Sequence, residues 1–173
     1  MQTAIIGGGC FWCVEAVFTR AKGVKSAISG YSGGARKNPS YEQICTGATG
    51  HAEVVKVEFD ESIITYEDIL DIFFEIHDPT TLNRQGADAG TQYRSVIYFL
   101  NEDQEDAAKA KIEELQKSLS SSIVTEVTPS PEFFNAEVYH QDYLTNNASQ
   151  GYCQAVVSPK VQKFMMKFKE FIK

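Results

Sequence analysis

The sequence predicts an α+β protein, a two-layer sandwich in which helices flank a mixed β-sheet. Short apolar runs with the character of strands alternate along the chain with longer segments that carry helix caps and helical spacing. The length of 173 residues suits one core of ordinary size. No internal repeat, low-complexity run or linker divides the chain. We therefore expect residues 1–173 to form a single domain.

The first half of the chain predicts three strands and two helices. The strands fall at residues 3–6, 24–34 and 53–59, and the helices at 10–23 and 66–78. Three glycines end the first strand, and apolar residues interleave with charged ones along the third, as in a half-buried strand. Thr65 is expected to cap the second helix, with Asp68 completing a capping box, and Pro79 marks its end.

The second half predicts two more strands and two more helices around a long coil. The strands fall at residues 92–100 and 123–127, the helices at 102–120 and 158–173, and the coil at 129–154. Asn101 is expected to cap the first of these helices, where acidic residues fill the first turn and lysines come later. The repeated strand–helix–strand order predicts a ferredoxin-like core that a long C-terminal coil follows.

Composition and charge exclude several classes of function. The chain is 43% hydrophobic and 23% charged, as in soluble globular proteins. Its net charge of −7 argues against nucleic acid as a partner, because phosphate binding requires a basic face. No apolar run is long enough to span a membrane, and the first residues do not read as a secretory signal. We therefore expect a cytoplasmic protein whose four cysteines stay reduced.

The stretch GGGCFWCVEA, residues 7–16, holds two of these cysteines, Cys10 and Cys13. If Cys10 lies where a strand passes through glycines into a helix, free N–H groups of the first turn face its sulfur. Such a position favours the thiolate and lowers the pKa of a cysteine. The alternative is that Cys10 is only a small buried hydrophobic residue at the start of the helix.

Three other kinds of cysteine chemistry fit the sequence less well. A thioredoxin-type C-x-x-C dithiol has the right spacing, but such motifs favour small residues or proline where Phe11 and Trp12 stand. A zinc site needs about four ligands, and no second cysteine or histidine pair supplies them, so we expect no metal. A Cys–His hydrolase would need a histidine base. The candidates are His51, His77 and His140, each of which suits a structural role equally well.

Three further stretches are unusual when they are taken together. They are SYEQICTGATGHAEVV at 40–55, HDPTTLNRQGADAGTQYRS at 77–95 and YHQDYLTNNASQGYC at 139–153. Each alone is typical of loops and turns. With GGGCFWCVEA before them, however, the chain resembles the A-type peptide methionine sulfoxide reductases over roughly residues 1–155.

This resemblance implies that the protein reduces the S-epimer of methionine sulfoxide, free or in proteins, to methionine. It implies that Cys10 is the nucleophile and that Phe11 and Trp12 hold the S-methyl group of the substrate. It also places the catalytic acid at Glu53. The remaining residues that match the substrate site of the family are Tyr41 and Tyr93, whose hydroxyls would bind the sulfoxide oxygen, and Asp88.

The chemistry requires residues of these types. A sulfoxide oxygen is a poor leaving group until it is protonated, so an acid and two phenol donors would stabilise the charge that develops on it. Burial among aromatic rings is expected to raise the pKa of Glu53 and keep it protonated near neutral pH. The attack would convert Cys10 to a sulfenic acid.

The regeneration of Cys10 leaves two candidates open. Many relatives carry glycine where Cys13 stands and recycle through cysteines near the C-terminus, which Cys153 matches. We expect Cys153, on a mobile coil, to resolve the sulfenic acid first, and Cys13 to be an alternative or a second relay. Cys45 is expected to be a buried and inert thiol, and Glu15 to form a salt bridge or face solvent.

The resemblance further implies no bound cofactor, thioredoxin as the reductant, and oxidised proteins or free methionine sulfoxide as partners. We expect a monomer. Two rival functions remain at this stage: a general dithiol–disulfide oxidoreductase that uses Cys10 and Cys13, and a module that binds oxidised methionine without reducing it.

Overall fold

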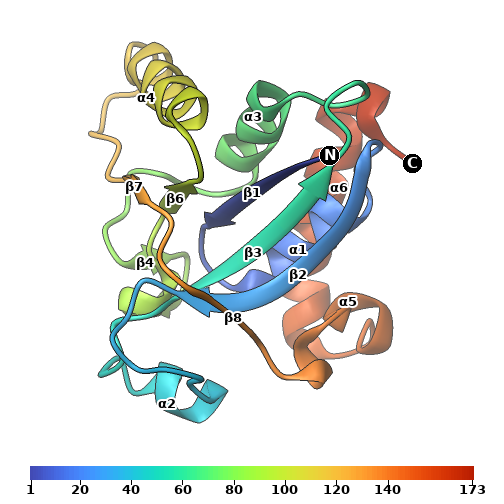
Figure 1. Ribbon diagram of the computed structural model, residues 1–173. Helices are drawn as coiled ribbons and strands as arrows, with labels where there is room; N and C mark the ends of the chain where they lie inside the picture. Colours follow the sequence, from blue (N-terminus) through green and yellow to red (C-terminus); the bar gives the residue numbers. More distant parts are fainter.

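The computed structural model describes all residues from 1 to 173 and contains a curled sheet of six strands (Figure 1). The strands are ordered β7-β6-β1-β3-β2-β8. Their bounds are β1 Gln2–Gly7, β2 Val24–Ser32, β3 Ala52–Phe59, β6 Val96–Phe99, β7 Glu126–Pro129 and β8 Phe133–Asn135. A second, two-stranded sheet joins β4 Arg84–Gln85 to β5 Asp88–Ala89.

The main sheet is mixed, as the sequence predicts. Strand β1 runs antiparallel to β3 and β6, and β2 runs antiparallel to β3 and β8. Only β6 and β7 pair in parallel. The register of β2 against β3 places Tyr31 opposite Glu53, near the end of both strands, so these two side chains lie on the same face of the sheet.

Six helices accompany the sheet. They are α1 Phe11–Thr19, α2 Tyr41–Cys45, α3 Tyr66–Ile76, α4 Glu102–Gln116, α5 Tyr143–Asn146 and α6 Ser158–Lys167. Helix α1 packs on β2, β3 and α6, and Figure 1 shows α1 and α6 together behind the sheet. One cluster of 32 buried residues forms the core and draws on the sheet and on most of the helices.

The predicted caps are confirmed. The side chain of Thr65 accepts a hydrogen bond from the backbone N–H of Asp68, and the Asp68 carboxylate accepts from the Thr65 N–H, which completes the capping box of α3. The side chain of Asn101 likewise accepts from the Gln104 N–H at the start of α4. These local sequence signals were sufficient because each cap needs only neighbouring residues.

The C-terminal tail differs from the predicted long coil. It contains β8, a 3-10 turn at Val138–His140, α5, and a π-helical turn at Cys153–Val157 that continues into α6. The prediction missed these short elements because contacts with distant residues hold them. The side chain of Gln141, for example, accepts from the N–H and donates to the carbonyl of Ser29, 112 residues away.

Three smaller predictions are also corrected. Tyr93 lies in the 3-10 turn Thr91–Tyr93 and not in the strand that follows. The strand expected at 123–127 lies at Glu126–Pro129, and the one-turn helix α2 was not predicted. Each difference falls beside a polar loop, where the apolar pattern is too short to fix an element.

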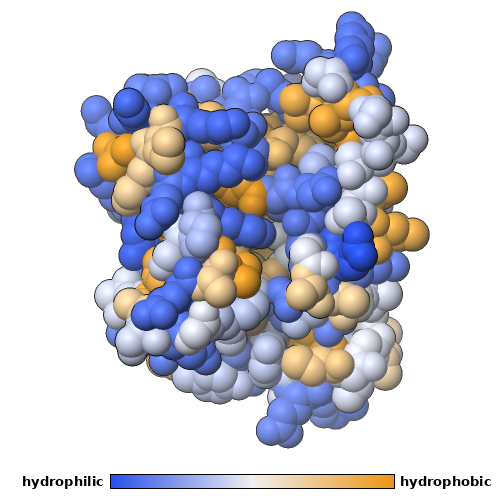
Figure 2. Space-filling model, turned by 180° about the vertical axis from the view of Figure 1, so that it is seen from behind, coloured by the Kyte–Doolittle hydropathy of each residue, from blue (hydrophilic) through white to orange (hydrophobic).

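The surface carries hydrophobic residues in separate spots. Figure 2 shows orange patches scattered among blue and white atoms on the face behind that of Figure 1. The large exposed apolar side chains are Met1, Ile63, Leu82, Leu100, Leu119, Val138, Tyr139 and Met166. None of the helices has both the length and the apolar character that a membrane crossing requires.

A substitution at Gly9 tests the packing around the loop between β1 and α1. Its φ of +83° favours glycine, and a Cβ there would lie 2.8 Å from the Gln85 side chain. We predict that Gly9→Ala lowers the free energy of unfolding by about 1–3 kcal/mol through backbone strain, with a further loss from the clash. Chemical denaturation measures this change.

Gly47 is the matched control for that substitution. Its φ is +76°, but nothing lies within 4 Å of the place of a Cβ. Gly47→Ala should therefore show the strain without the clash. Equal losses at the two positions would contradict the close packing of Gly9 against Gln85.

Candidate active site

Cys10 occupies the N-cap position of α1, directly after the glycine loop. The loop is packed tightly, because a Cβ on Gly8 would lie 2.8 Å from the ring of His77. The N–H of Gly9 donates to the carbonyl of Tyr93 at 3.2 Å, so the loop is tied to the turn that carries Tyr93. The Cys10 side chain is 8% exposed, and it therefore lies at the edge of the core.

Glu53 is the buried acid of this region. It lies near the start of β3 with 1% of its surface exposed, and its Oε1 accepts a hydrogen bond from the backbone N–H of Phe11 at 3.1 Å. Its Oε2 is buried and makes no hydrogen bond. Burial raises the pKa of Glu53 to about 8, against the opposing effect of the Phe11 N–H. The expectation that this carboxyl is protonated near neutral pH is confirmed.

The pKa of Cys10, in contrast, differs from the prediction. A backbone N–H of the first turn, that of Trp12, does favour the thiolate. Burial outweighs it, and the neighbouring Cys13 and Glu53 act in the same direction, so the pKa of Cys10 lies well above its ordinary value. The expectation of a lowered pKa was wrong because the helix terminus at this thiol is desolvated.

The four cysteines are all free, and Cys10, Cys13 and Cys153 are buried. Cys10 and Cys13 are neighbours at the start of α1, where the Cys13 N–H donates to the Cys10 carbonyl at 3.1 Å. The nearby Cys10 thiol lowers the pKa of Cys13, with a further contribution from the positive charge of Lys160. Cys153 is fully buried, and the charge of Cys13 is close enough to raise its pKa. Cys13 therefore interacts with both of the other buried thiols.

Cys153 and Cys45 both occupy surroundings that the sequence did not indicate. Cys153 was expected on a mobile coil, but it begins the π-helical turn next to α6 and is buried. Cys45 was expected to be buried, but it is exposed at the end of α2. Ile44 is the one buried residue of this short helix, and Cys45 follows it on the exposed side.

Aromatic rings surround the start of α1. The ring of Phe11 lies 5.6 Å from Tyr31 and 5.1 Å from His140, measured between ring centroids. The indole of Trp12 stacks on Tyr143 at 3.7 Å with an interplanar angle of 3°, and its Nε1–H donates to Nδ1 of His140 at 3.0 Å. Both rings are thus fixed by residues from the C-terminal tail.

Tyr41 and Tyr93 reach the same region from α2 and from the 3-10 turn. Burial, followed by the charge of Glu53, raises the pKa of each phenol, and the two phenols also interact with each other. Both therefore remain hydroxyl donors at all ordinary pH values. The charge of Glu53 thus acts on both phenols, which lie in the same region of the protein.

Asp88, in β5, is hydrogen-bonded to the segment that carries Cys153. Its Oδ2 accepts a hydrogen bond of 2.6 Å from the hydroxyl of Tyr152, the residue before Cys153. The Tyr152 ring meets Trp12 edge to face at 5.7 Å. Asp88 also acts on Glu53 as a negative charge that raises its pKa. The bond to Tyr152 therefore joins the Asp88 loop to the segment that carries Cys153.

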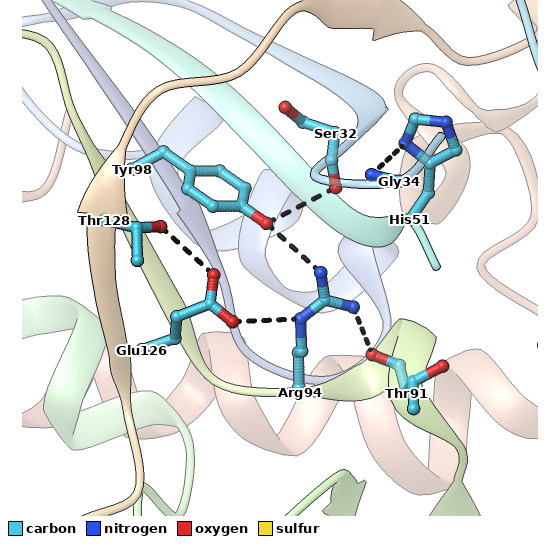
Figure 3. Close-up of polar contacts among 8 residues, drawn as sticks. All are labelled: Ser32, Gly34, His51, Thr91, Arg94, Tyr98, Glu126 and Thr128. Carbon is cyan, nitrogen blue, oxygen red and sulfur yellow. Dashed lines mark hydrogen bonds and ion pairs between the residues drawn. The ribbon is translucent and has the colours of Figure 1, made fainter. Parts of the chain in front are cut away.

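Arg94 holds the turn of Tyr93 against the sheet (Figure 3). Its guanidinium donates to the carbonyl of Thr91 at 2.9 Å and to the hydroxyl of Tyr98 at 3.2 Å, and it pairs with the carboxylate of Glu126 at 3.5 Å. The Tyr98 hydroxyl in turn lies 3.5 Å from the carbonyl of Ser32. This network links the turn to β6, β7 and the end of β2.

Two residues around the site have surroundings that the sequence analysis did not indicate. His140 is fully buried, burial lowers its pKa, and its Nδ1 accepts from the indole of Trp12. Glu15 was expected in solvent or in a salt bridge, but it is 2% exposed and accepts from the Asp142 N–H at 2.5 Å. The sequence analysis assigned no role to Tyr31, Glu137 or Tyr152, and no local structural pattern marks them, although Tyr152 lies in the stretch 139–153 noted there.

The other two histidines have structural partners. His77 is buried between the carbonyl of Phe73 and the hydroxyl of Ser95, and His51 accepts from the Gly34 N–H, as Figure 3 shows. A cleft of about 610 Å³ borders His77, but neither Cys10 nor Glu53 lines it. No group of three or more His, Cys, Asp and Glu is arranged to hold a metal ion.

A buried acid, a neighbouring pair of thiols and a cage of aromatic rings define a thiol-based oxidoreductase site. The sequence model of the family described as peptide methionine sulfoxide reductase matches residues 2–171. A peptide methionine sulfoxide reductase of Pasteurella multocida is 57% identical over 172 residues, which cover 99% of both chains. The chain belongs to the peptide methionine sulfoxide reductase family.

Solved structures agree with this assignment. Mxr1 of Saccharomyces cerevisiae in its reduced form is similar with a TM-score of 0.80 and 35% identity, over 88% of each chain. A structure of Mxr1 in complex with Trx2 is similar with a TM-score of 0.56 and 25% identity, over 82% of this chain and 84% of that one.

The raised pKa of Glu53 predicts how stability depends on pH. The folded protein holds this proton up to about pH 8, whereas the unfolded chain releases it near the ordinary value of 4.5, so folding binds a proton between these pH values. The free energy of unfolding should therefore fall as the pH rises through this window, by roughly 3 kcal/mol from this residue. Denaturation at pH 5 and pH 8 measures the change.

Glu53→Gln isolates that contribution, since an amide does not titrate. The variant should lose part of the pH dependence that the unmodified protein shows between pH 5 and pH 8. Identical pH dependence in the two proteins would mean that Glu53 is not the proton-binding group.

Proposed function

We propose that the protein reduces the S-epimer of methionine sulfoxide, free or within proteins, to methionine at Cys10. The observation that carries the proposal is Glu53, a buried carboxyl with a pKa of about 8 at the N-terminus of the helix that Cys10 caps. A protonated acid at this place suits a substrate whose oxygen must be protonated to leave. Membership of the family supports the same reaction.

The substrate would bind through its methyl group and its oxygen. The rings of Phe11 and Trp12 offer an apolar surface to the S-methyl group, and the hydroxyls of Tyr41 and Tyr93 donate to the oxygen. Because methyl group and oxygen then occupy different subsites, only one configuration at sulfur presents its lone pair to Cys10. In support, Oε2 of Glu53 is buried without a partner, which costs free energy until an acceptor reaches it.

The reduction transfers one oxygen atom. The sulfur of Cys10 bonds to the sulfoxide sulfur while Glu53 gives its proton to the oxygen and the thiol proton passes to Glu53. The protonated oxygen then forms a bond to the sulfur of Cys10, while the S–O bond of the substrate and the transient bond between the two sulfurs break and the electron pair returns to the methionine sulfur. Methionine leaves and Cys10 remains as a sulfenic acid. Asp88, through its hydrogen bond to Tyr152, would keep the wall of the site opposite Glu53 in place.

A second thiol then resolves the sulfenic acid. We propose Cys13 as the first resolver and Cys153 as the relay, in the reverse of the order that the sequence suggests. Cys13 lies next to Cys10 in the first turn of α1, its N–H donates to the Cys10 carbonyl at 3.1 Å, and its pKa is lowered, whereas Cys153 is buried in a separate helical turn. The thiolate of Cys13 attacks the sulfenic sulfur, a disulfide forms, and water leaves.

The final reductant would be thioredoxin, which takes the disulfide back to two thiols and becomes oxidised itself. The similarity to Mxr1, which was solved in complex with Trx2, supports this partner. A reducing compartment such as the cytoplasm would keep the three thiols in the form that the cycle needs. Cytoplasmic fractionation of cells would test that location.

Two finer points of architecture also remain proposals. The order β6-β1-β3-β2, with antiparallel pairing of β1 and β2 to β3 and a helix after β1 and β3, supports a ferredoxin-like core. The cluster of 32 buried residues, which spans Ala4 to Phe164, supports a single domain over residues 1–173. We further propose a monomer, which sedimentation at several concentrations would test.

An N-acetylated methionine sulfoxide of defined configuration, with dithiothreitol as reductant, tests the reaction. We predict that the S-epimer is consumed and the R-epimer is not, and that Cys10→Ser abolishes turnover. Glu53→Gln should slow the reaction at least 100-fold because an amide is a far weaker proton donor. In the unmodified protein kcat should fall above about pH 8, where Glu53 loses its proton.

The outcomes separate the rival functions. Reduction of insulin disulfides without loss of any sulfoxide would mean a general disulfide oxidoreductase. Binding of the sulfoxide without turnover would mean a binding module. An unchanged rate in Glu53→Gln would remove Glu53 from the acid role.

Disulfide mapping by mass spectrometry tests the resolver. After one equivalent of substrate without reductant, Cys153→Ser should hold a Cys10–Cys13 disulfide, because Cys13 acts first. In Cys13→Ser the sulfenic acid of Cys10 should persist longer and be trapped by dimedone. Rapid formation of a Cys10–Cys153 disulfide in that variant would restore the order that the sequence suggests.

A further inference from the structure

Glu137 joins three parts of the chain at the edge of the site. It lies between β8 and the 3-10 turn that carries His140, and its side chain is half-buried. Its Oε1 accepts from the hydroxyl of Tyr31 at 2.9 Å, and its Oε2 accepts from the backbone N–H of Tyr41 at 2.9 Å. The carboxylate thus spans from β2 to the first residue of α2.

The bond to Tyr41 matters because α2 is short and has few other anchors, chiefly Ile44 and the Tyr41 ring itself. The helix has five residues, of which only Ile44 is buried. Its own capping box satisfies the N–H groups of Ser40 and Gln43, but not that of Tyr41. Glu137 supplies the missing acceptor from a position 96 residues further along the chain.

The carboxylate is charged, which strengthens both bonds. Burial raises the pKa of Glu137, but the hydrogen bonds from the Tyr41 N–H and the Tyr31 hydroxyl outweigh this effect, and the pKa lies below its ordinary value. An ionised acceptor forms a shorter and stronger hydrogen bond than a neutral one, so the start of α2 is held firmly.

Glu137 is not needed to keep the C-terminal tail in place. Gln141 already fixes this segment through two hydrogen bonds to the backbone of Ser29 and one to the carbonyl of Ala136. Asp142 adds a bond from its N–H to Glu15. The specific consequence of losing Glu137 is therefore expected at Tyr41, against whose ring His140 packs at 4.4 Å.

We propose that Glu137 is a positioning residue for the reduction of the sulfoxide. It fixes the backbone of Tyr41 at the start of α2, and through it the direction in which the Tyr41 hydroxyl donates to the sulfoxide oxygen. This inference rests on the proposed function. Tyr31 also donates to the Glu137 carboxylate, and it lies opposite Glu53 in the pairing of β2 with β3. Tyr31 therefore sets the distance between Tyr41 and the acid Glu53.

A double-mutant cycle between Glu137 and Tyr41 tests the proposal. The rate of a single turnover is measured by quenched flow, as N-acetylmethionine formed from the S-epimer of N-acetylmethionine sulfoxide. Glu137→Ala should slow this step about 10-fold, because a displaced donor loses its interaction with the transition state. In a Tyr41→Phe background the same substitution should change the rate less than about 2-fold, since no hydroxyl is left to orient.

Glu137→Gln is the conservative variant. Its amide oxygen can still accept from the Tyr41 N–H while its NH₂ group faces the oxygen of Tyr31, so the rate should return to within about 3-fold of the unmodified protein. The emission of Trp12, the single tryptophan, reports on the tail through its contacts with Tyr143 and His140. It should be unchanged in Glu137→Ala.

Two results would overturn the proposal. The first is a Glu137→Ala variant as fast as the unmodified protein. The second is an equal loss of rate with and without the Tyr41 hydroxyl, which would mean that Glu137 supports the fold and not the donor. Failure of the proposed function is distinguishable from both, because the unmodified protein would then form no methionine at all.

Discussion

The hydrogen bond from the Phe11 N–H to the buried carboxyl of Glu53 is the contact on which the site depends. It joins the first turn of α1 to the start of β3, and so brings the thiol of Cys10 and a proton donor into one desolvated space. A helix N-terminus would ordinarily favour an anion. Burial prevails here, and the carboxyl stays neutral at the pH of most cells.

The same desolvation acts on the nucleophile. A thiol with a raised pKa is a poor nucleophile toward chance oxidants, because the thiolate is the reactive form. The proposed reaction does not need a free thiolate beforehand, since the proton lost by Cys10 replaces the one that Glu53 gives away. Selectivity would then come from the substrate, whose oxygen must reach the acid and the two phenols together.

Much of the fold was predictable because it rests on local signals. The caps at Thr65 and Asn101, the glycines before Cys10 and the apolar pattern of β3 act over a few residues. The residues of the proposed site could be listed from the motifs that resemble the family. The tail was not predictable, because short elements such as β8 and α5 form only against distant partners. The pKa of Cys10 and the burial of Cys153 also depend on packing between distant parts of the chain. The spacing of residues in the sequence does not predict such packing.

The aromatic wall of the site has a consequence for how the protein is made. The hydrogen bond from Trp12 to His140 spans 128 residues, and that from Asp142 to Glu15 spans 127. Contacts between residues so far apart in the sequence form late in folding, because the chain between the two residues must be ordered first. During synthesis the N-terminal strand and helix emerge from the ribosome long before their partners near residue 140. The nascent chain thus carries its thiols without a finished active centre, and reactivity arises only when nearly the whole chain has been translated.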